Sequence, residues 1–220
     1  MQILPISESG KTIDSFLKMF SFDITPHLRL LKFRPGEHLF RQGEGEQKLY
    51  YVIRGRAKIL INQPNGRTSL VAFLQAPAFV GELELLGSQQ QSHSVVATGT
   101  LTAFAINTAT CREQLLQDAG FLRELCLFLS RKTLQNSVSH SKNASYPLEV
   151  RLADFILKNE IRGSYSQPHT EVCQYLGVSY RHLLYVFADF VDRGLLKKEG
   201  RRYTVADREG LHAISAEMDE

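Results

Sequence analysis

The chain has 220 residues, of which 43 % are hydrophobic and 22 % are charged, and its formal net charge at pH 7 is +3. This is an ordinary globular composition, which argues against a disordered chain, and no apolar run approaches the roughly 18 residues that a membrane span needs. Up to Pro147 the chain carries 16 basic and 11 acidic residues, and after it 10 basic and 12 acidic residues. The two parts therefore have net charges of +5 and −2, and overall charge does not by itself indicate a nucleic-acid-binding half.

Cysteine usage and the N-terminus indicate a reducing compartment. The three cysteines, Cys111, Cys126 and Cys173, are odd in number and widely spaced, which argues against a disulfide framework and a C-x-x-C metal signature. Residues 1–18 lack the apolar core of a secretory signal. We therefore expect a soluble cytoplasmic protein with no membrane partner. Cys126 and Cys173 are interpreted as buried small residues, and Cys111 as the cysteine that is most exposed.

From about residue 27 to residue 106, short apolar runs alternate with turns that contain glycine. This spacing is typical of a sandwich or barrel and predicts a compact antiparallel β-roll. Because Asn-Gly accepts positive φ at both central positions of a turn, we expect a two-residue hairpin at Asn65-Gly66. The other predicted turns are at Pro35-Gly36, Gln42-Gly43 and Arg54-Gly55.

The apolar period changes to that of a helix between residues 110 and 140, where proline is absent. Gly120 is predicted to separate a short helix from a longer one over about residues 121–140, roughly 30 Å long at 1.5 Å per residue. We expect an edge with Phe121 and Phe128 to pack on the β-roll and the other stripe to face a second copy of the chain. The alternative is a helix that packs only within its own subunit. The residues predicted to face the partner are Leu122, Leu125, Leu129, Thr133 and Asn136.

The segment from Pro168 to Phe190 has the spacing of two helices that cross tightly. Pro168 suits the first position of a helix, and Gly177 suits the positive φ of a helix end. Val178 is predicted to fill the gap between the helices, and Ser179 to cap the second one. The inner face of the second helix is predicted to consist of Leu183, Val186, Phe187 and Phe190.

The outward residues at the start of the second helix are predicted to contact base edges in the DNA major groove. Arg181 suits a bidentate pair with guanine, and a tyrosine suits a thymine methyl group or a phosphate. The alternative is that these side chains are only solvated. The predicted base contacts are Ser179, Tyr180, Arg181, His182 and Tyr185.

A hairpin with its turn at Glu199-Gly200 is predicted to follow the second helix. The basic residues around this turn outnumber Glu199 by four; they are Arg193, Lys197, Lys198, Arg201 and Arg202. Such a local patch is suited to the DNA backbone. The predicted phosphate contacts are His169, Thr170, Lys197, Lys198, Arg201 and Arg202.

Three stretches together resemble the CRP/FNR family, the cyclic-AMP receptor and fumarate-nitrate regulators of bacteria. They are residues 33–58, which contain Phe33-Arg-Pro-Gly-Glu, residues 79–86, which read Phe79-Val-Gly-Glu-Leu-Glu-Leu-Leu, and the helix-turn-helix with its hairpin. The resemblance implies an α+β fold with a cyclic-nucleotide-binding-type β-roll (an antiparallel double-stranded β-helix), a long dimerisation helix and a C-terminal winged helix-turn-helix. It also implies a homodimer that reads an inverted repeat in double-stranded DNA, with RNA polymerase as a further candidate partner.

The predicted domains follow from these elements. Residues 1–108 form N-terminal helices and the β-roll, and residues 109–142 form the short helix and the dimerisation helix. The polar stretch 143–147, which ends in a proline, is a hinge. Residues 148–220 form the winged helix-turn-helix domain, which begins with another amphipathic helix.

Departures from the family pattern bear on the effector. Members that bind cyclic AMP combine Gly-Glu-Leu with an arginine about ten residues later. Here no arginine lies between Arg67 and Arg112, and Ser92, His93 and Ser94 occupy the corresponding place. Because a buried phosphate without its cation is costly, we do not expect cyclic AMP, and Glu82 is interpreted as a structural residue that bonds backbone N–H groups. The weaker prediction of an effector pocket, for an effector of unknown identity, comprises Gly81, Glu82, Leu83, His93 and Ser94.

No cofactor, metal or catalytic residue is predicted. An iron–sulfur cluster of the family type needs four cysteines, most of them near the N-terminus, but no cysteine precedes Cys111. An enzyme of the cupin type is a competing interpretation, yet His38 and Glu44 are the only nearby pair of potential metal ligands. A third interpretation is an effector-binding module that acts on a protein partner, which the basic hairpin disfavours.

Overall fold

The computed structural model describes residues 1–44, 47–64, 66, 68–88 and 93–218. The chain divides into two units, residues 1–133 and 134–220. In the first unit the strands are β1 (Gln2–Leu4), β2 (Leu28–Phe33), β3 (His38–Phe40), β4 (Lys48–Arg54), β5 (Arg56–Asn62), β6 (Thr68–Gln75), β7 (Ala78–Val80), β8 (Ser94–Ala97) and β9 (Leu101–Asn107). Its helices are α1 (Thr12–Leu17), α2 (Glu82–Leu86), α3 (Arg112–Gln117) and the beginning of α4 (Ala119–Ser145), with 3-10 turns η1 (Ile6–Ser9) and η2 (Thr25–His27).

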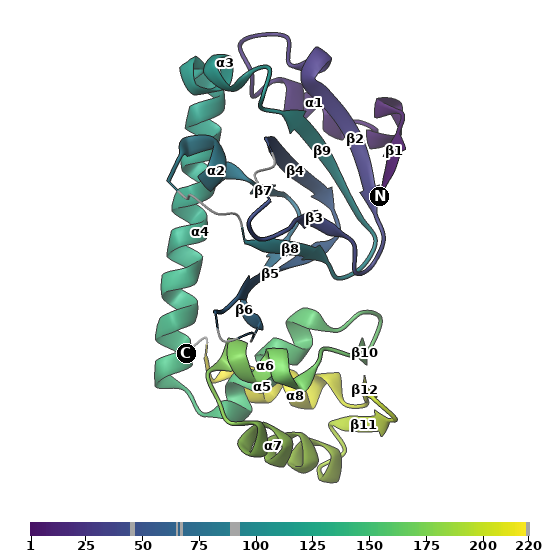
Figure 1. The fold of residues 1–220 in the computed structure, drawn as a ribbon. Helices are drawn as coiled ribbons and strands as arrows, with labels where there is room; N and C mark the ends of the chain where they lie inside the picture. Colours follow the sequence, from purple (N-terminus) through teal and green to yellow (C-terminus); the bar gives the residue numbers. More distant parts are fainter. Residues whose placement is uncertain (45–46, 65, 67, 89–92, 219–220) are drawn as a thin grey trace. The chain divides into compact units, whose positions relative to one another are not determined.

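The strands of the first unit form two antiparallel sheets, with the orders β1-β2-β9-β4-β7 and β3-β8-β5-β6 (Figure 1). The chain passes from one sheet to the other at Gly55, between β4 and β5. Gly55 has φ +97°, and a Cβ at this position would lie 2.5 Å from the carbonyl oxygen of Thr100. Only glycine fits such a close approach of two chain segments, so the crossover depends on this residue. The predicted β-roll is confirmed.

Two apolar clusters lie on opposite faces of the five-stranded sheet. Alternate residues of β2 show the division, because Leu31 and Phe33 pack into the cluster shared with the second sheet, whereas Leu28 and Leu30 pack into the cluster shared with α1, α3 and α4. This alternation follows from the two-residue period of a strand. The long helix α4 therefore covers the roll with side chains such as Phe121, which is fully buried.

Asp118, rather than Gly120, separates α3 from α4. Its carboxylate accepts hydrogen bonds from the backbone N–H groups of Gly120 at 2.9 Å and Phe121 at 3.1 Å, and from that of Ser21 at 2.7 Å. Burial opposes the ionisation of Asp118, but these hydrogen bonds outweigh it and lower its pKa. The predicted break at Gly120 is wrong because an aspartate cap, not a flexible glycine, begins the long helix.

Helix α4 is also longer than predicted, since it continues through Ser145. Residues 143–145 of the predicted hinge are therefore helical, and only Tyr146 and Pro147 separate α4 from α5 (Leu148–Asn159). The polar composition of this stretch suggested a loop, but polar residues occur in helices as well.

The hairpin between β5 and β6 also differs from its prediction. Asn62 pairs with Thr68, so residues 63–67 connect the two strands. This loop is longer than a two-residue turn. Gly66 has positive φ, while Asn65 lies outside the described residues.

The second unit, from residue 134, contains the rest of α4 and a small mixed domain. Its helices are α5, α6 (His169–Leu176), α7 (Tyr180–Asp192) and α8 (Arg208–Ala216), and its three-stranded sheet has the order β10 (Ser164–Tyr165), β12 (Arg202–Val205) and β11 (Leu196–Glu199). Helix α8 was not predicted, although Asp207 caps it by accepting from the backbone N–H of Gly210 at 2.8 Å. None of the helices described here combines the length and apolar character of a membrane span.

Candidate nucleic-acid interface

Helices α6 and α7 form the predicted crossed pair. Gly177 ends α6 in the left-handed conformation with φ +65°, and the Ser179 hydroxyl accepts from the backbone N–H of His182 at 3.2 Å, which caps α7. Leu183 and Phe187 are buried on the inner side of α7. Pro168 lies one position earlier than predicted, at the cap of α6 rather than in its first turn. The helix boundaries predicted from these local signals therefore agree with the structure to within one residue.

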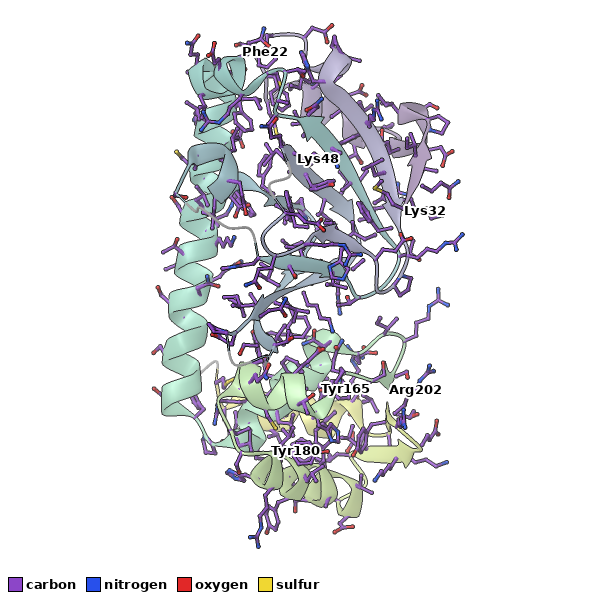
Figure 2. All side chains as sticks on the ribbon, in the orientation of Figure 1. Phe22, Lys32, Lys48, Tyr165, Tyr180 and Arg202 are labelled. Atoms are coloured by element: carbon purple, nitrogen blue, oxygen red, sulfur yellow. The ribbon has the colours of Figure 1, made fainter. Side chains whose placement is uncertain are left out.

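The outer side of α7 presents the predicted base-contacting residues together. Tyr180, Arg181, His182 and Tyr185 are all exposed, and Ser179 is exposed at the cap. Tyr180 is labelled in Figure 2. Since residues three and four apart lie on one helical face, Arg181 and Tyr185 are neighbours. Leu184 is exposed beside them, and sequence analysis did not single it out. Its position one residue after the inward-facing Leu183 is the signal that would have found it.

The strands β11 and β12 form the predicted wing. Their register pairs Lys198 with Tyr203 and Glu199 with Arg202, and the turn contains Gly200 and Arg201. Tyr203 is buried and anchors the hairpin. Four exposed basic residues, termed the wing cations, form no salt bridge with any residue in the described part of the chain; they are Lys197, Lys198, Arg201 and Arg202.

Arg193 does not belong with the wing cations, although the sequence grouped it with them. Its guanidinium donates to the carboxylates of Glu149 and Asp189, the latter at 3.1 Å. These two acceptors raise its pKa and engage its charge. The basic patch that DNA would meet is therefore smaller than predicted by one charge.

His169 is part of an aromatic cluster that joins α6, α7 and the wing. Its ring stacks on Phe187, with centroids 4.6 Å apart, and lies 5.7 Å from the ring of Tyr203. Burial, and then the nearby charge of Lys198, lower the pKa of His169 from its ordinary value of 6.5. A half-buried, neutral imidazole does not attract phosphate by charge, so a phosphate contact at this residue would rest on its backbone N–H at the start of α6. Thr170 is exposed beside it.

Glu82, at the centre of the predicted effector pocket, has a side-chain partner on the long helix. Its residue exposure is only 3 %, and Lys132 Nζ donates to its Oε1 at 2.6 Å. The same ammonium lies 5.8 Å from the centroid of the Phe128 ring. Among the described residues the partner of Glu82 is thus an ammonium group and not a backbone N–H, which corrects the prediction. Lys132 was not among the predicted site residues, although it lies seven residues after the buried Leu125, where a charge needs a partner.

The other predicted pocket residues have structural contacts. Gly81 has φ +94°, and a Cβ there would lie 2.6 Å from the carbonyl oxygen of Lys48. Ser94 is buried, and its hydroxyl accepts from the backbone N–H of Gln42 at 3.1 Å. Leu83 and His93 are half-buried, whereas Ser92 lies outside the described residues. Positions 93 and 94 are a histidine and a serine, and neither is the arginine of the family pattern.

The partner-facing stripe predicted on α4 is wrong at Leu125. This side chain is 1 % exposed and belongs to the core beneath α4, and Leu122 and Leu129 pack against the same cluster. Thr133 and Asn136 are exposed. The large apolar residues that α4 leaves exposed are instead Leu127, Leu134 and Val138. The helix has apolar residues on two sides, and periodicity alone does not show which side meets the roll.

The cysteine predictions are correct for Cys173 and wrong for the other two. Cys173 is buried at the helix crossing, but Cys111 is buried as well and Cys126 is exposed. Burial raises the pKa of Cys111 to about 11, so this thiol is not ionised at neutral pH.

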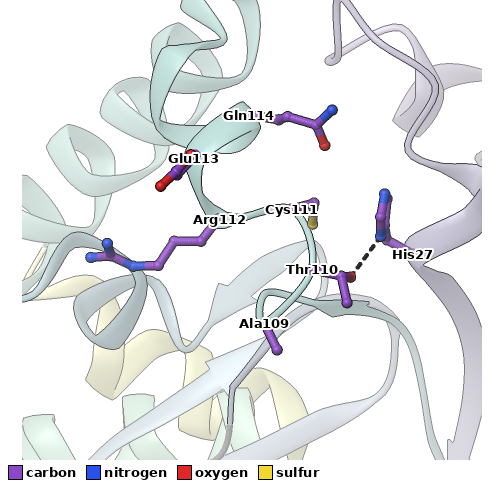
Figure 3. A pocket seen from close by; sticks show the side chains of 7 residues that line it. All are labelled: His27, Ala109, Thr110, Cys111, Arg112, Glu113 and Gln114. Atoms are coloured by element: carbon purple, nitrogen blue, oxygen red, sulfur yellow. Dashed lines mark hydrogen bonds between the residues drawn. The ribbon is translucent and has the colours of Figure 1, made fainter.

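An open depression of about 570 Å³ lies beside α3. Its lining side chains, those of His27 and residues 109–114, are drawn in Figure 3. His27 Nδ1 lies 2.7 Å from Thr110 Oγ1, and the Arg112 guanidinium donates to the carbonyl oxygen of Leu85 at 2.8 Å. None of these residues belongs to the predicted effector pocket. Within the described residues no group of three or more His, Cys, Asp and Glu side chains is arranged to hold a metal ion.

A β-roll followed by a winged helix-turn-helix defines a class of DNA-binding transcription regulators, and comparison with known families agrees. The family model of the cyclic nucleotide-binding domain matches residues 30–118, and that of the Crp-like helix-turn-helix domain matches residues 150–214. The chain belongs to the CRP/FNR family of bacterial transcription regulators. The resemblance seen in the sequence is thereby confirmed.

Relatives cover nearly the whole chain. It is 40 % identical over 205 residues to the regulatory protein YeiL of Escherichia coli O157:H7, a match that spans 93 % of this chain and 94 % of that protein. It is 22 % identical over 198 residues to a CRP-like cAMP-activated global transcriptional regulator of Mycobacterium tuberculosis, with coverages of 86 % and 88 %. A solved CRP/FNR-family regulator of Eubacterium rectale has a similar fold, with a TM-score of 0.74 at 16 % identity, over 96 % of this chain and 98 % of that one.

Proposed function

We propose that this regulator binds an inverted-repeat operator as a homodimer, with α7 of each subunit in the major groove. The observation that carries the proposal is the division of α7 into two sides. Tyr180, Arg181 and Tyr185 are exposed on the outer side, while Leu183 and Phe187 hold the helix from the inner side. A helix anchored in this way can present its N-terminal residues to base edges. Arg181 is the residue proposed to make a bidentate contact to guanine.

The wing cations are proposed to bind the phosphate backbone beside the recognition helix. They are exposed on both strands and the turn of the wing. Exposed charges of this kind release counterions from DNA when they bind, which gives affinity without sequence preference. Further phosphate contacts would come from the start of α6, through Thr170 and the backbone N–H of His169.

Dimerisation through α4 is proposed to use its exposed apolar side. Leu127 and Leu134 are seven residues apart and Val138 follows four residues later, so that the three side chains recur as in a coiled-coil seam. All three are exposed in the single chain. A second copy of α4 would remove these apolar surfaces from water.

The residues of the β-roll do not fit cyclic AMP. In the family pattern the glutamate accepts the ribose hydroxyl and an arginine pairs with the phosphate. Here the Glu82 carboxylate is held by Lys132 at 2.6 Å, and the sequence between Arg67 and Arg112 contains neither arginine nor lysine. A cyclic phosphate would be buried without the arginine that pairs with it in the family pattern. We therefore propose that cyclic AMP is not the effector, and RNA polymerase and an effector of other chemistry remain predicted partners.

Catalysis is not part of the proposed function. The family consists of transcription regulators, and the wing cations disfavour a module that acts only through a protein partner. An enzyme and a module that acts through a protein partner would both select no DNA consensus in the experiment below. The absence of a consensus would therefore overturn the present proposal.

The test is selection of bound DNA from a random duplex pool by the full chain, followed by affinity measurements on the selected operator. Arg181→Ala is expected to lose about 1–3 kcal/mol at one base pair per half-site and to leave binding to unselected DNA unchanged. The control variant, Arg201→Ala with Arg202→Ala, is expected to weaken all sequences alike and to reduce the salt slope by about 2 per subunit. Unchanged operator affinity in Arg181→Ala would show that α7 does not read the bases.

A further inference from the structure

The outer side of α7 carries an apolar surface between its polar residues. Tyr180, Leu184 and Tyr185 are 50 %, 39 % and 74 % exposed, and all three lie within six residues of one helix. Leu184 lies four residues after Tyr180 and three after Arg181, so that the aliphatic side chain shares a face with both. Ala188, four residues further, is exposed as well. The apolar atoms therefore continue the face that Arg181 begins.

Leu184 has no hydrogen-bonding group, which limits what it can recognise. Hydrogen bonds to base edges and phosphates are open to Arg181, His182 and the tyrosine hydroxyls, but not to an isobutyl group. The major groove presents one apolar group, the C5-methyl of thymine. Exposed aliphatic surface in the middle of an otherwise polar DNA-facing helix is thus matched by that methyl group and by no other feature of the groove.

We propose that Leu184, flanked by Tyr185, reads thymine methyl groups in the operator. This inference rests on the proposed position of α7 in the major groove. Three residues of helix advance by about 4.5 Å, and successive base pairs are separated by roughly 3.4 Å. The thymine contacted by Leu184 therefore lies one or two base pairs from the guanine contacted by Arg181.

The experiment replaces thymines of the selected operator, one position at a time, by deoxyuridine, which keeps base pairing and lacks only the methyl group. Binding of the full chain is measured by fluorescence anisotropy. With both half-sites substituted, we expect about a three- to tenfold loss of affinity at one position near the guanine. Leu184→Ala is expected to bind the thymine and deoxyuridine operators equally well.

A matched control keeps the comparison specific. Ile161→Ala removes another exposed aliphatic side chain, 59 % exposed and outside α7, and is expected to discriminate thymine from deoxyuridine as the unmodified chain does.

The outcomes separate this inference from the proposed function. An operator that needs Arg181 but binds equally with deoxyuridine at every position would leave the proposed function standing and overturn the role of Leu184. Persisting discrimination in Leu184→Ala would overturn it as well. A random pool that yields no consensus would remove both proposals together.

Discussion

The first unit neutralises the charge in its predicted effector pocket, whereas the second unit leaves the charges of its wing exposed. Glu82 is buried and paired with Lys132, while the wing cations have no salt-bridge partner among the described residues. Burying an unpaired charge is costly, and leaving one in water is not. Charges that face solvent without a partner are therefore available to a polyanion, whereas the paired charges of Glu82 and Lys132 are already engaged.

Burial and exposure also separate two leucines of α4, since Leu125 is buried and Leu134 is exposed. Substitutions at these two positions are expected to have the largest effects. Leu125→Ala is expected to lower the free energy of unfolding by about 2–5 kcal/mol, because it creates a cavity in the core between α4 and the five-stranded sheet. Leu134→Asp is expected to leave folding intact and to yield monomers, because Leu134 is exposed on the proposed dimer seam. Denaturant titration and analytical ultracentrifugation measure the two effects. Monomers from Leu125→Ala with dimers from Leu134→Asp would reverse the assignment of the two sides.

The buried ion pair gives the next effect. Lys132→Met is expected to destabilise the chain by about 1–3 kcal/mol, because Glu82 is then buried without its cation; the lower part of the range applies if water reaches the site, since the Lys132 side chain is 32 % exposed. The double variant with Glu82→Gln is expected to recover most of this loss, because no charge is left unpaired. Thermal unfolding of both variants provides the measurement. A double variant as unstable as the single one would show that the pair does not account for the effect.

The smallest effect concerns His169 and the acidic side of neutrality. Because the pKa of His169 is lower in the folded chain than its ordinary value of 6.5, the unfolded chain binds a proton first as the pH falls. The contribution of neutral His169 to the free energy of unfolding is therefore complete above pH 6.5. It declines as the pH falls toward the folded-state pKa. His169→Phe keeps the ring stacking and removes this titration, so its melting temperature is expected to fall less than that of the unmodified chain between pH 7.5 and 5.5. Equal falls would exclude His169 as a contributor.

The winged helix-turn-helix could be predicted nearly to the residue because its signals are local. Gly177 and Ser179 end one helix and begin the next through their own backbone and side-chain preferences. The side of α4 that meets the roll could not be predicted, since Leu125 and Leu134 are equally apolar and only tertiary packing distinguishes them. The helix α8 and the pair Glu82–Lys132 escaped prediction for a related reason. A short C-terminal helix has a weak period, and the contact spans 50 residues of chain.

The backbone at Gly81 has a consequence for how such sequences are read. A side chain at this position would collide with the strand that carries Lys48, so the glycine is required by the roll whether or not a nucleotide binds. Glu82 is likewise retained by its partner on α4. The tripeptide Gly-Glu-Leu is therefore a marker of chain geometry, and the arginine that contacts the phosphate is the residue that reports on cyclic nucleotides. A survey based on the tripeptide alone would select this chain for its backbone geometry at Gly81, whatever its effector is.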